Sequence, residues 1–113
     1  MSDPLQGAPF PIEIGHAVDR TVLDRIILRP SPDVQGTTMD GETVLLDLST
    51  GRYYTLNRLG SVIWEHCTGQ RTMADIHRAI CERFEVAPEQ ALDDLVALAN
   101  ELIQEGLLQQ EGR

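Results

Sequence analysis

The feature that most constrains the fold is a change of hydrophobic period near Leu56. Between residues 34 and 56, apolar side chains recur at every second position, as in Val44, Leu46 and Leu48, which is typical of β-strands. After Leu56 they recur every three or four positions, which is typical of amphipathic helices. At 113 residues the chain suits one domain with a single small core. The sequence therefore predicts an α+β domain in which strands come first and helices follow.

Three short strands with tight connections are predicted before Leu56. Residues 34–39 are the weakest candidate, and the Asp40-Gly41 pair after them favours a tight turn. Residues 49–51 supply a second turn, with a glycine that accepts a positive φ. The third strand spans residues 52–56 and is an edge of the predicted antiparallel meander. An uncovered edge has unpaired backbone groups and invites another strand.

Three helices are predicted from capping residues and apolar stripes. Asn57 is a good N-cap for the first helix, and Gly69 would end it. Thr72 with Asp75 resembles a capping box at the start of the second, and Pro88 suits the first position of the third. Gly106 would end that helix. The stripes are Leu59, Val62, Ile63 and Cys67 on the first helix, Met73, Ile76, Ile80 and Phe84 on the second, and Leu92, Leu95, Leu98, Ala99 and Leu102 on the third.

The two ends of the chain carry weaker signals. Residues 1–20 mix prolines, glycines and scattered apolar residues without a lasting period. We expect a flexible arm there, or a segment that becomes ordered only against a partner. Residues 21–29 could add a strand, and Leu107-Leu108 could return as another. The folded domain is therefore expected to span residues 21–113.

The charge of the chain excludes several classes of function. Eighteen acidic and nine basic side chains give a formal net charge of -9, which disfavours nucleic-acid binding because that binding depends on clustered cations. The basic residues are all arginines, so lysine Schiff-base chemistry and a phosphate-loop lysine are excluded. The sequence shows neither a membrane-spanning apolar run nor a signal peptide. Two cysteines without a secretion signal favour a cytoplasmic protein with reduced thiols.

Catalytic and metal-binding motifs are weak. The sequence contains no nucleophile elbow, no H-E-x-x-H, no C-x-x-C and no glycine-rich phosphate loop, so we do not expect an enzyme. His77 and Cys81 are one helical turn apart and His66 is next to Cys67, which could supply zinc ligands. No second paired motif completes such a site, and core cysteines with half-exposed histidines explain the same pattern. We expect no metal and no cofactor.

Two features remain as candidate binding surfaces. The Tyr53-Tyr54 pair places one tyrosine on each face of the third strand, and a tyrosine on the exposed face suits a binding surface. From Glu85 to Glu111 the chain has seven acidic residues and no basic one. This run is either a solvated helix face or an electrostatic docking surface for a basic partner. The Asp93-Asp94 pair points in directions about 100° apart on a helix, so it does not form a catalytic dyad.

The order and spacing of several short motifs resemble the PqqD family. These are small proteins and domains that recognise precursors of ribosomally made, post-translationally modified peptides. The G-R-Y-Y-x-L-N variant resembles stand-alone members, including those of lasso-peptide clusters, more than the protein of quinone-cofactor synthesis. The similarity covers about residues 27–109. Its landmarks are Leu45-Leu46-Asp47, Gly51-Arg52-Tyr53-Tyr54, Leu56-Asn57, the helix with Trp64, Gly69 before Thr72, and the segment from Asp94 to Leu108.

The resemblance implies a winged-helix-like fold of three strands and three helices. It also implies a non-catalytic adaptor that presents a precursor peptide to a modifying enzyme, such as a radical-SAM, protease-like or cyclase protein. In this family the leader adds a strand beside the third strand, in the groove formed with the third helix. The peptide-binding residues would then be Arg52, Tyr53, Tyr54, Thr55 and Leu56 on the strand, and Glu89, Leu92, Asp93, Asp94, Leu95 and Val96 on the helix.

We therefore expect peptide recognition of two kinds at these residues. Alternate side chains of an added strand would enter apolar pockets. Carboxylates would pair with basic residues of the leader and mainly raise the association rate. The pockets would be lined by Tyr54, Leu56, Leu92, Leu95 and Val96, and the carboxylates would be those of Glu89, Asp93 and Asp94.

Two other readings compete with the adaptor. A winged-helix DNA-binding regulator could use the same elements, but its recognition helix should carry arginine or lysine, and the third helix carries neither. A structural subunit could instead dimerise edge to edge and exchange its N-terminal arm. Size-exclusion chromatography with light scattering would separate this last reading from a monomeric adaptor.

Overall fold

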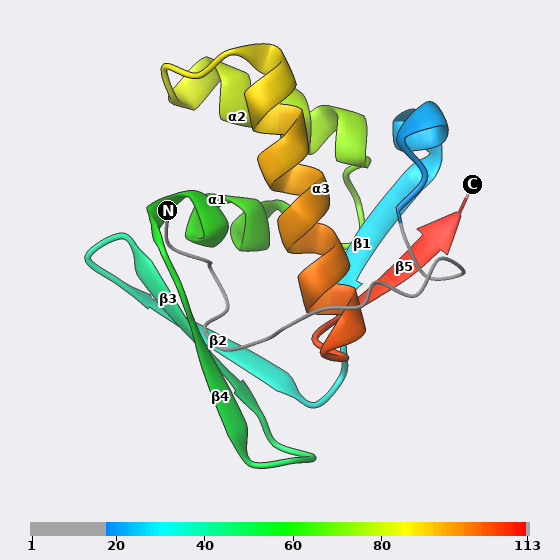
Figure 1. The fold of residues 1–113 in the computed structure, drawn as a ribbon. Coiled ribbons are helices and arrows are strands. Elements are labelled where there is room, and N and C mark those ends of the chain that lie inside the picture. The colour runs from blue at the N-terminus through cyan, green and yellow to red at the C-terminus, as the bar shows by residue number, and fades with distance from the viewer. Residues whose placement is uncertain (1–17, 113) are drawn as a thin grey trace.

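A computed structural model describes residues 18–112 of the chain (Figure 1). The part of the predicted arm at residues 1–17 lies outside the described residues. Strands and helices follow in the predicted order, which confirms an α+β fold with a three-stranded antiparallel sheet. The elements are the 3-10 helix η2 (Arg20–Arg25), strands β1 (Ile26–Pro30), β2 (Val34–Met39), β3 (Glu42–Asp47) and β4 (Arg52–Leu56), helices α1 (Arg58–His66), α2 (Met73–Arg83) and α3 (Pro88–Gln104), and strand β5 (Leu108–Gly112).

Strands β2, β3 and β4 form the predicted meander, in the order β2-β3-β4. The first hairpin turns at Asp40 and Gly41, whose φ values of 55° and 81° are those of a tight two-residue turn. The second turns through residues 48–51, where Gly51 has a φ of 77°. Gly36 of β2 faces Trp64, and a Cβ at Gly36 would lie 2.8 Å from the indole nitrogen, so this position has no room for a side chain.

A second, two-stranded sheet joins the two ends of the described chain. β1 pairs antiparallel with β5, and Arg29 of β1 forms an ion pair of 3.0 Å with Glu111 of β5. The expected strand over residues 21–29 was wrong in its first half, which is 3-10 helix. The Asp19 carboxylate accepts a hydrogen bond from the Thr21 backbone N–H and starts this helix locally. The expected strand at Leu107-Leu108 begins at Leu108.

The helix boundaries follow local capping chemistry. The Asn57 side chain accepts from the Gly60 N–H at 2.8 Å and starts α1. Thr72 and Asp75 form the reciprocal capping box of α2, with both hydrogen bonds present. Pro88 occupies the first turn of α3. The expected end of the first helix at Gly69 was wrong, because α1 ends at His66 and the next residue already forms its C-cap.

The core lies between the helices and one face of the meander. Ile63 of α1, Ile76 of α2 and Leu95 of α3 are fully buried and pack with Leu45 and Leu56 of the sheet. The face of β3 that carries most of its apolar residues is not the buried one. The buried face holds Thr43, Leu45 and Asp47, while Val44, Leu46 and Leu48 are exposed.

Hydrogen bonds explain why polar residues occupy the buried face of β3. The Thr43 and Thr38 hydroxyl oxygens lie 2.6 Å apart across the β2–β3 pair. The Asp47 carboxylate accepts from the Ser49 N–H at 2.9 Å and from the Ser49 hydroxyl at 2.7 Å. These bonds satisfy the buried polar atoms, so the apolar face of the strand is left available on the outside.

Candidate peptide-binding site

The direction of the backbone groups in the meander follows from two hydrogen bonds at the second hairpin. The Leu48 N–H donates to the Asp33 carbonyl on the β2 side at 2.8 Å. The Gly51 N–H donates to the Asp47 carbonyl at 2.8 Å, so Asp47 directs its backbone toward β4. Hydrogen-bonded and non-hydrogen-bonded pairs alternate along an antiparallel ladder. The directions of the backbone groups at Leu48 and Asp47 therefore give the directions at all remaining residues of the meander.

This alternation leaves two residues of β4 with outward-pointing backbone groups. Leu45 pairs with Tyr54 across the ladder and exchanges hydrogen bonds with it. Tyr53 and Thr55 lie at the intervening positions, so their N–H and C=O groups point away from β3. β4 is the last strand of its sheet, so these groups meet no further strand among the described residues. The same reasoning gives the opposite edge of the sheet, on β2, outward groups at Gly36 and Thr38.

A side-chain hydrogen bond links β4 to the end of helix α3. The Tyr54 hydroxyl donates to a Glu105 carboxylate oxygen at 3.1 Å, just beyond the last turn of α3. Partial burial raises the pKa of Tyr54, and the bonded carboxylate of Glu105 also raises it. Leu98 reaches Gly60 at the start of α1, next to the end of β4. The inner side of β4 therefore contacts Glu105 just beyond α3, and the buried Leu98 of α3 lies near the end of the strand.

The expected helix residues do not all face β4. Leu95 and Val96 are buried in the core, and the half-buried Leu92 packs against it. Asp93 forms an ion pair of 2.8 Å with Arg20 of η2, which places Asp93 on the side of α3 that faces η2. The remaining two carboxylates lie toward the start of the helix, where Glu89 is exposed and Asp94 accepts from the Gln90 side chain at 2.9 Å.

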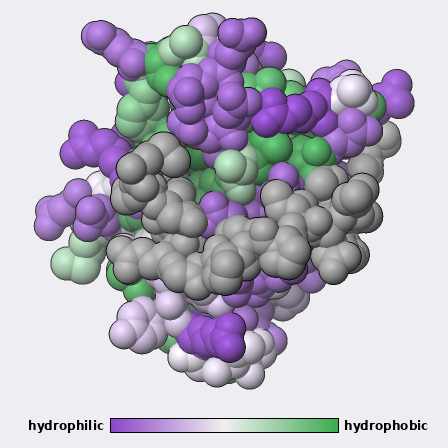
Figure 2. All heavy atoms as spheres, viewed as in Figure 1, coloured by the Kyte–Doolittle hydropathy of each residue, from purple (hydrophilic) through white to green (hydrophobic). Residues whose placement is uncertain are grey.

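Sequence reasoning missed Glu105, which the structure brings to Tyr54 of β4, and Leu98, which it brings to the start of α1 next to the end of β4. Leu98 and Glu105 are seven positions apart, which places them on one face of a helix. That spacing was visible in the sequence, but the orientation of the helix was not. The contact of Arg20 with Asp93 comes from a segment without a hydrophobic period, so no signal in the sequence predicted this contact. Hydrophilic side chains cover much of the molecular face on which α3 lies (Figure 2).

A second surface lies on the outer face of the meander. The large apolar residues with high exposure in the described part of the chain all belong to it, and we call them the outer apolar face. The face is continuous with the β4 edge, because Tyr53 belongs to both and lies directly opposite Leu46. Its residues and exposed fractions are Met39 69%, Val44 46%, Leu46 37%, Leu48 56% and Tyr53 73%.

The histidine and cysteine pairs have structural partners. His77 Nε2 lies 2.8 Å from the Pro88 carbonyl and 3.6 Å from Cys81 Sγ, so it ties α2 to the start of α3. His66 Nδ1 lies 2.8 Å from the Val62 carbonyl. Burial raises the pKa of Cys67 to about 12, so its thiol is protonated near neutral pH. Over residues 18–112, no group of three or more potential ligands is arranged to hold a metal ion.

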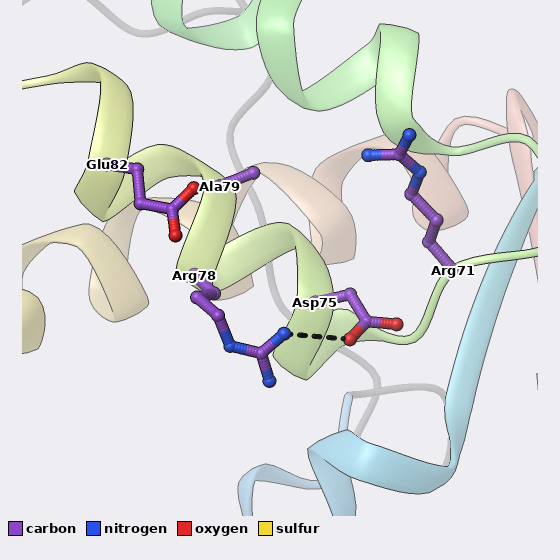
Figure 3. Close-up of a pocket in the computed structure, with 5 residues that line it drawn as sticks. All are labelled: Arg71, Asp75, Arg78, Ala79 and Glu82. Carbon is purple, nitrogen blue, oxygen red and sulfur yellow. Dashed lines mark hydrogen bonds and ion pairs between the residues drawn. The ribbon is translucent and has the colours of Figure 1, made fainter.

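A shallow hollow of about 340 Å³ lies along α2 (Figure 3). It is lined by charges of both signs, and its Arg78–Asp75 ion pair of 3.2 Å is already formed. Asp75 is also held by the Thr72 capping box, which lowers the pKa of its carboxyl together with Arg78. Figure 3 shows Arg71 and Glu82 at opposite sides of the hollow, so the hollow lacks a converging set of groups that chemistry would need.

Comparisons with known proteins give the family of this chain. A family model described as coenzyme PQQ synthesis protein D (PqqD) matches residues 42–108, which is more than half of the chain and includes β4 and α3. The chain belongs to the PqqD family. No curated protein matches it in sequence. Among the described residues, no helix has the length and apolar composition needed to cross a membrane.

Two solved structures of complexes with leader peptides are similar to this chain. TbiB1 in complex with the TbiA(beta) leader peptide shares 32% identity at a TM-score of 0.68, over 72% of this chain and 94% of that one. A lasso peptide synthetase B1 complexed with the leader peptide shares 27% identity at a TM-score of 0.66, over 73% and 96% of the two chains. The heterocyclase TruD, at 18% identity and a TM-score of 0.56, matches over 12% of its own length and shows the fold alone.

Proposed function

We propose that this protein is a non-catalytic adaptor that binds the leader of a precursor peptide by β-strand addition and presents it to a modifying enzyme. The observation that carries the proposal is the edge of β4, where Tyr53 and Thr55 point their backbone groups outward and meet no further strand among residues 18–112. Two solved structures that resemble the chain above 25% identity are complexes with leader peptides. A strand added at this edge would gain main-chain hydrogen bonds from these two residues.

Side-chain selection would come from the two faces of the added strand. On the inner side, alternate leader residues would meet Tyr54 and Glu105, with the buried Leu56 and Leu98 packed behind them in the core. The inner side of the strand would be supported from the core and from the far side of the helix by Leu92, Leu95 and Val96. On the outer side, leader residues would lie beside Tyr53. The carboxylates of Glu89 and Asp94, which form no ion pair among residues 18–112, would attract basic leader residues, whereas Asp93 is paired with Arg20.

The modifying enzyme would dock on the outer apolar face. Soluble proteins rarely expose such a patch unless it meets a partner, and two sheet faces pack well against each other. The patch is continuous with the β4 edge through Tyr53, so an enzyme that covers Leu46 and Val44 would lie next to a leader bound at β4. The position of the patch therefore fits a protein that presents the bound peptide to an enzyme.

The test is a set of three single substitutions titrated calorimetrically with the cognate precursor peptide. Thr55→Pro removes an outward-pointing donor at the β4 edge without breaking a bond to β3, and should lose most binding. Thr55→Ala keeps the N–H and should bind like the parent. Thr38→Pro places the same change on the β2 edge and should also bind like the parent. Folding of each variant is checked by circular dichroism, and parent-like binding by folded Thr55→Pro would reject strand addition at β4.

The two competing readings lack a supporting observation. A recognition helix for DNA should be basic, and α3 with its flanks from Glu85 to Glu111 carries no basic residue. Edge-to-edge dimerisation through β4 would compete with the leader for the same backbone groups. It predicts a dimer by light scattering that dissociates on addition of peptide.

A further inference from the structure

Two polar residues of β4 share the inner face of the strand with a carboxylate from the end of α3. Arg52 and Tyr54 are two positions apart, and they lie opposite the buried Asp47 and Leu45 of β3. Glu105, just beyond α3, accepts the hydrogen bond of 3.1 Å from the Tyr54 hydroxyl. We call Arg52, Tyr54 and Glu105 the polar cluster. It brings a cation, a hydroxyl and a carboxylate to one place beside the β4 edge.

The two charged members of the polar cluster act on the same hydroxyl. Burial is the largest cause of the raised pKa of Tyr54, while the Arg52 guanidinium lowers this pKa and the Glu105 carboxylate raises it. Neither charge forms an ion pair among residues 18–112. A guanidinium has several N–H donors and a carboxylate has a second oxygen, so contact with one hydroxyl leaves hydrogen-bonding capacity on both.

The position of Glu105 is fixed by the way α3 ends. The Glu105 N–H donates to the Glu101 carbonyl at 3.0 Å, and the next residue, Gly106, turns the chain with a φ of 78°. The Gly106 carbonyl accepts from the Ser31 hydroxyl at 2.6 Å, which ties this turn to the residue that follows β1. The backbone is therefore held on both sides of the carboxylate that bonds to β4, as a selective binding site requires.

The alternation of the β4 edge places one leader residue beside the polar cluster. Tyr53 and Thr55 have the outward backbone groups, so an added antiparallel strand would form its hydrogen-bonded pairs with them. The leader residue between these pairs would lie opposite Tyr54, at a non-hydrogen-bonded position, where side chains approach each other closely. Its side chain would lie on the inner face, next to Glu105 and within diagonal reach of Arg52.

We propose that the polar cluster selects a carboxamide side chain, that of asparagine or glutamine, at this leader position. The carboxamide oxygen accepts from Arg52, and the carboxamide NH₂ group donates to Glu105. Arg52 repels a basic side chain there, and Glu105 repels an acidic one. An apolar side chain removes water from both charges without replacing its hydrogen bonds. This inference deepens the proposed function and rests on it, because it needs a strand added at β4.

The test selects phage-displayed random peptides of about ten residues, the length of one strand, on the immobilised full-length protein. Peptides that bind the parent but not the folded Thr55→Pro variant are those that use the β4 edge. Asparagine or glutamine should be enriched at one position of these peptides. In a synthetic copy of a selected peptide, leucine at that position should weaken binding at least about tenfold by calorimetry.

Two charge reversals should change this preference in opposite directions. Arg52→Glu places two carboxylates around the position, so the same selection should enrich lysine or arginine there. Glu105→Arg places two cations around it and should enrich aspartate or glutamate. Glu65→Arg and Arg71→Glu make the matched changes at exposed residues on α1 and beside α2, and should keep the carboxamide. Circular dichroism checks the fold of each variant, and each reversal tests the proposal by itself.

The outcomes separate this inference from the proposed function. Peptides that depend on Thr55 but show no carboxamide preference, or the parent's preference retained by the reversed variants, would overturn the selective site and leave strand addition in place. Libraries that yield no peptide dependent on Thr55 would reject strand addition at β4, and the selective site with it. The proposal predicts a changed preference in each reversed variant and an unchanged one in both controls.

Discussion

At the scale of single residues, Asp75 shows how one carboxylate serves two contacts. It closes the capping box with Thr72 and pairs with Arg78, and the Thr72 bonds lower its pKa most. A carboxyl whose pKa is lowered by folding stabilises the folded state above its unfolded pKa, near 3.9. That stability is lost as the pH falls through this range toward the lower folded pKa.

Replacing Asp75 by asparagine should therefore remove a pH-dependent part of the stability. At neutral pH, Asp75→Asn should unfold at a lower urea concentration than the parent. The difference should shrink as the pH falls below about 4, because the parent carboxyl is then protonated as well. Urea unfolding followed by circular dichroism from pH 7 to pH 3 measures it. Curves that run parallel at every pH would contradict the assigned role.

Ile63 is the residue that most simply tests the buried face of α1. It is fully buried, while Glu65 two positions later is exposed. Ile63→Ala should destabilise the protein by about 2–5 kcal/mol, since it leaves a cavity in the core. Glu65→Ala should change stability by less than about 0.5 kcal/mol. Thermal melts of both variants decide the matter, and equal melting temperatures would refute the face assignment.

At the scale of elements, local signals in the sequence predicted the starts of helices, whereas tertiary contacts decided which face of a strand is buried. Asn57, Thr72 with Asp75, and Pro88 predicted helix starts because a cap acts within one turn of chain. The strands were predictable from their period, but the buried face of β3 was not. Its polar residues are satisfied by Thr38 and Ser49, which only the folded chain brings close.

The candidate site likewise has one part that the sequence predicted and one part that it did not. The strand residues from Arg52 to Leu56 were placed on an edge because the meander follows from short turns alone. The contacts of α3 with Val18 and Arg20 occupy the side of the helix that carries Asp93. Those contacts arise in a segment with no periodic pattern, so the sequence pointed to Asp93 and did not point to Glu105.

The outer apolar face gives a prediction that separates leader binding from presentation. Leu46→Asp places a charge in the middle of that face, which the added leader strand does not need. The variant should bind the precursor peptide like the parent but should lose at least tenfold in complex formation with the cognate modifying enzyme. Gln109→Asp adds the same charge on β5, away from the face, and is the control. If both variants bind the enzyme like the parent, the outer face is not its docking surface.

At the scale of the whole molecule, the net charge of -9 should affect the rate at which the protein associates with its peptide. Exposed carboxylates on and around α3 raise the association rate of a basic leader, and added salt screens them. Asp94→Lys reverses one of these charges without disturbing the Arg20–Asp93 pair. We expect the parent's affinity to fall between about 50 and 500 mM salt, and the variant's affinity to fall less. Calorimetry at the two salt concentrations measures both, and equal salt dependence would remove α3 from the electrostatic account.

The central claim is that a leader peptide adds a strand to the edge of β4. The most direct measurement is isotope-filtered NMR of the full-length protein with its unlabelled precursor peptide, which detects nuclear Overhauser effects between the two chains. The account predicts cross-strand effects between backbone protons of the leader and those of Tyr53 and Thr55, with none to Thr38 on the opposite edge. Leader contacts confined to β2 or to the outer apolar face, with no effect at Tyr53 or Thr55, would contradict the claim.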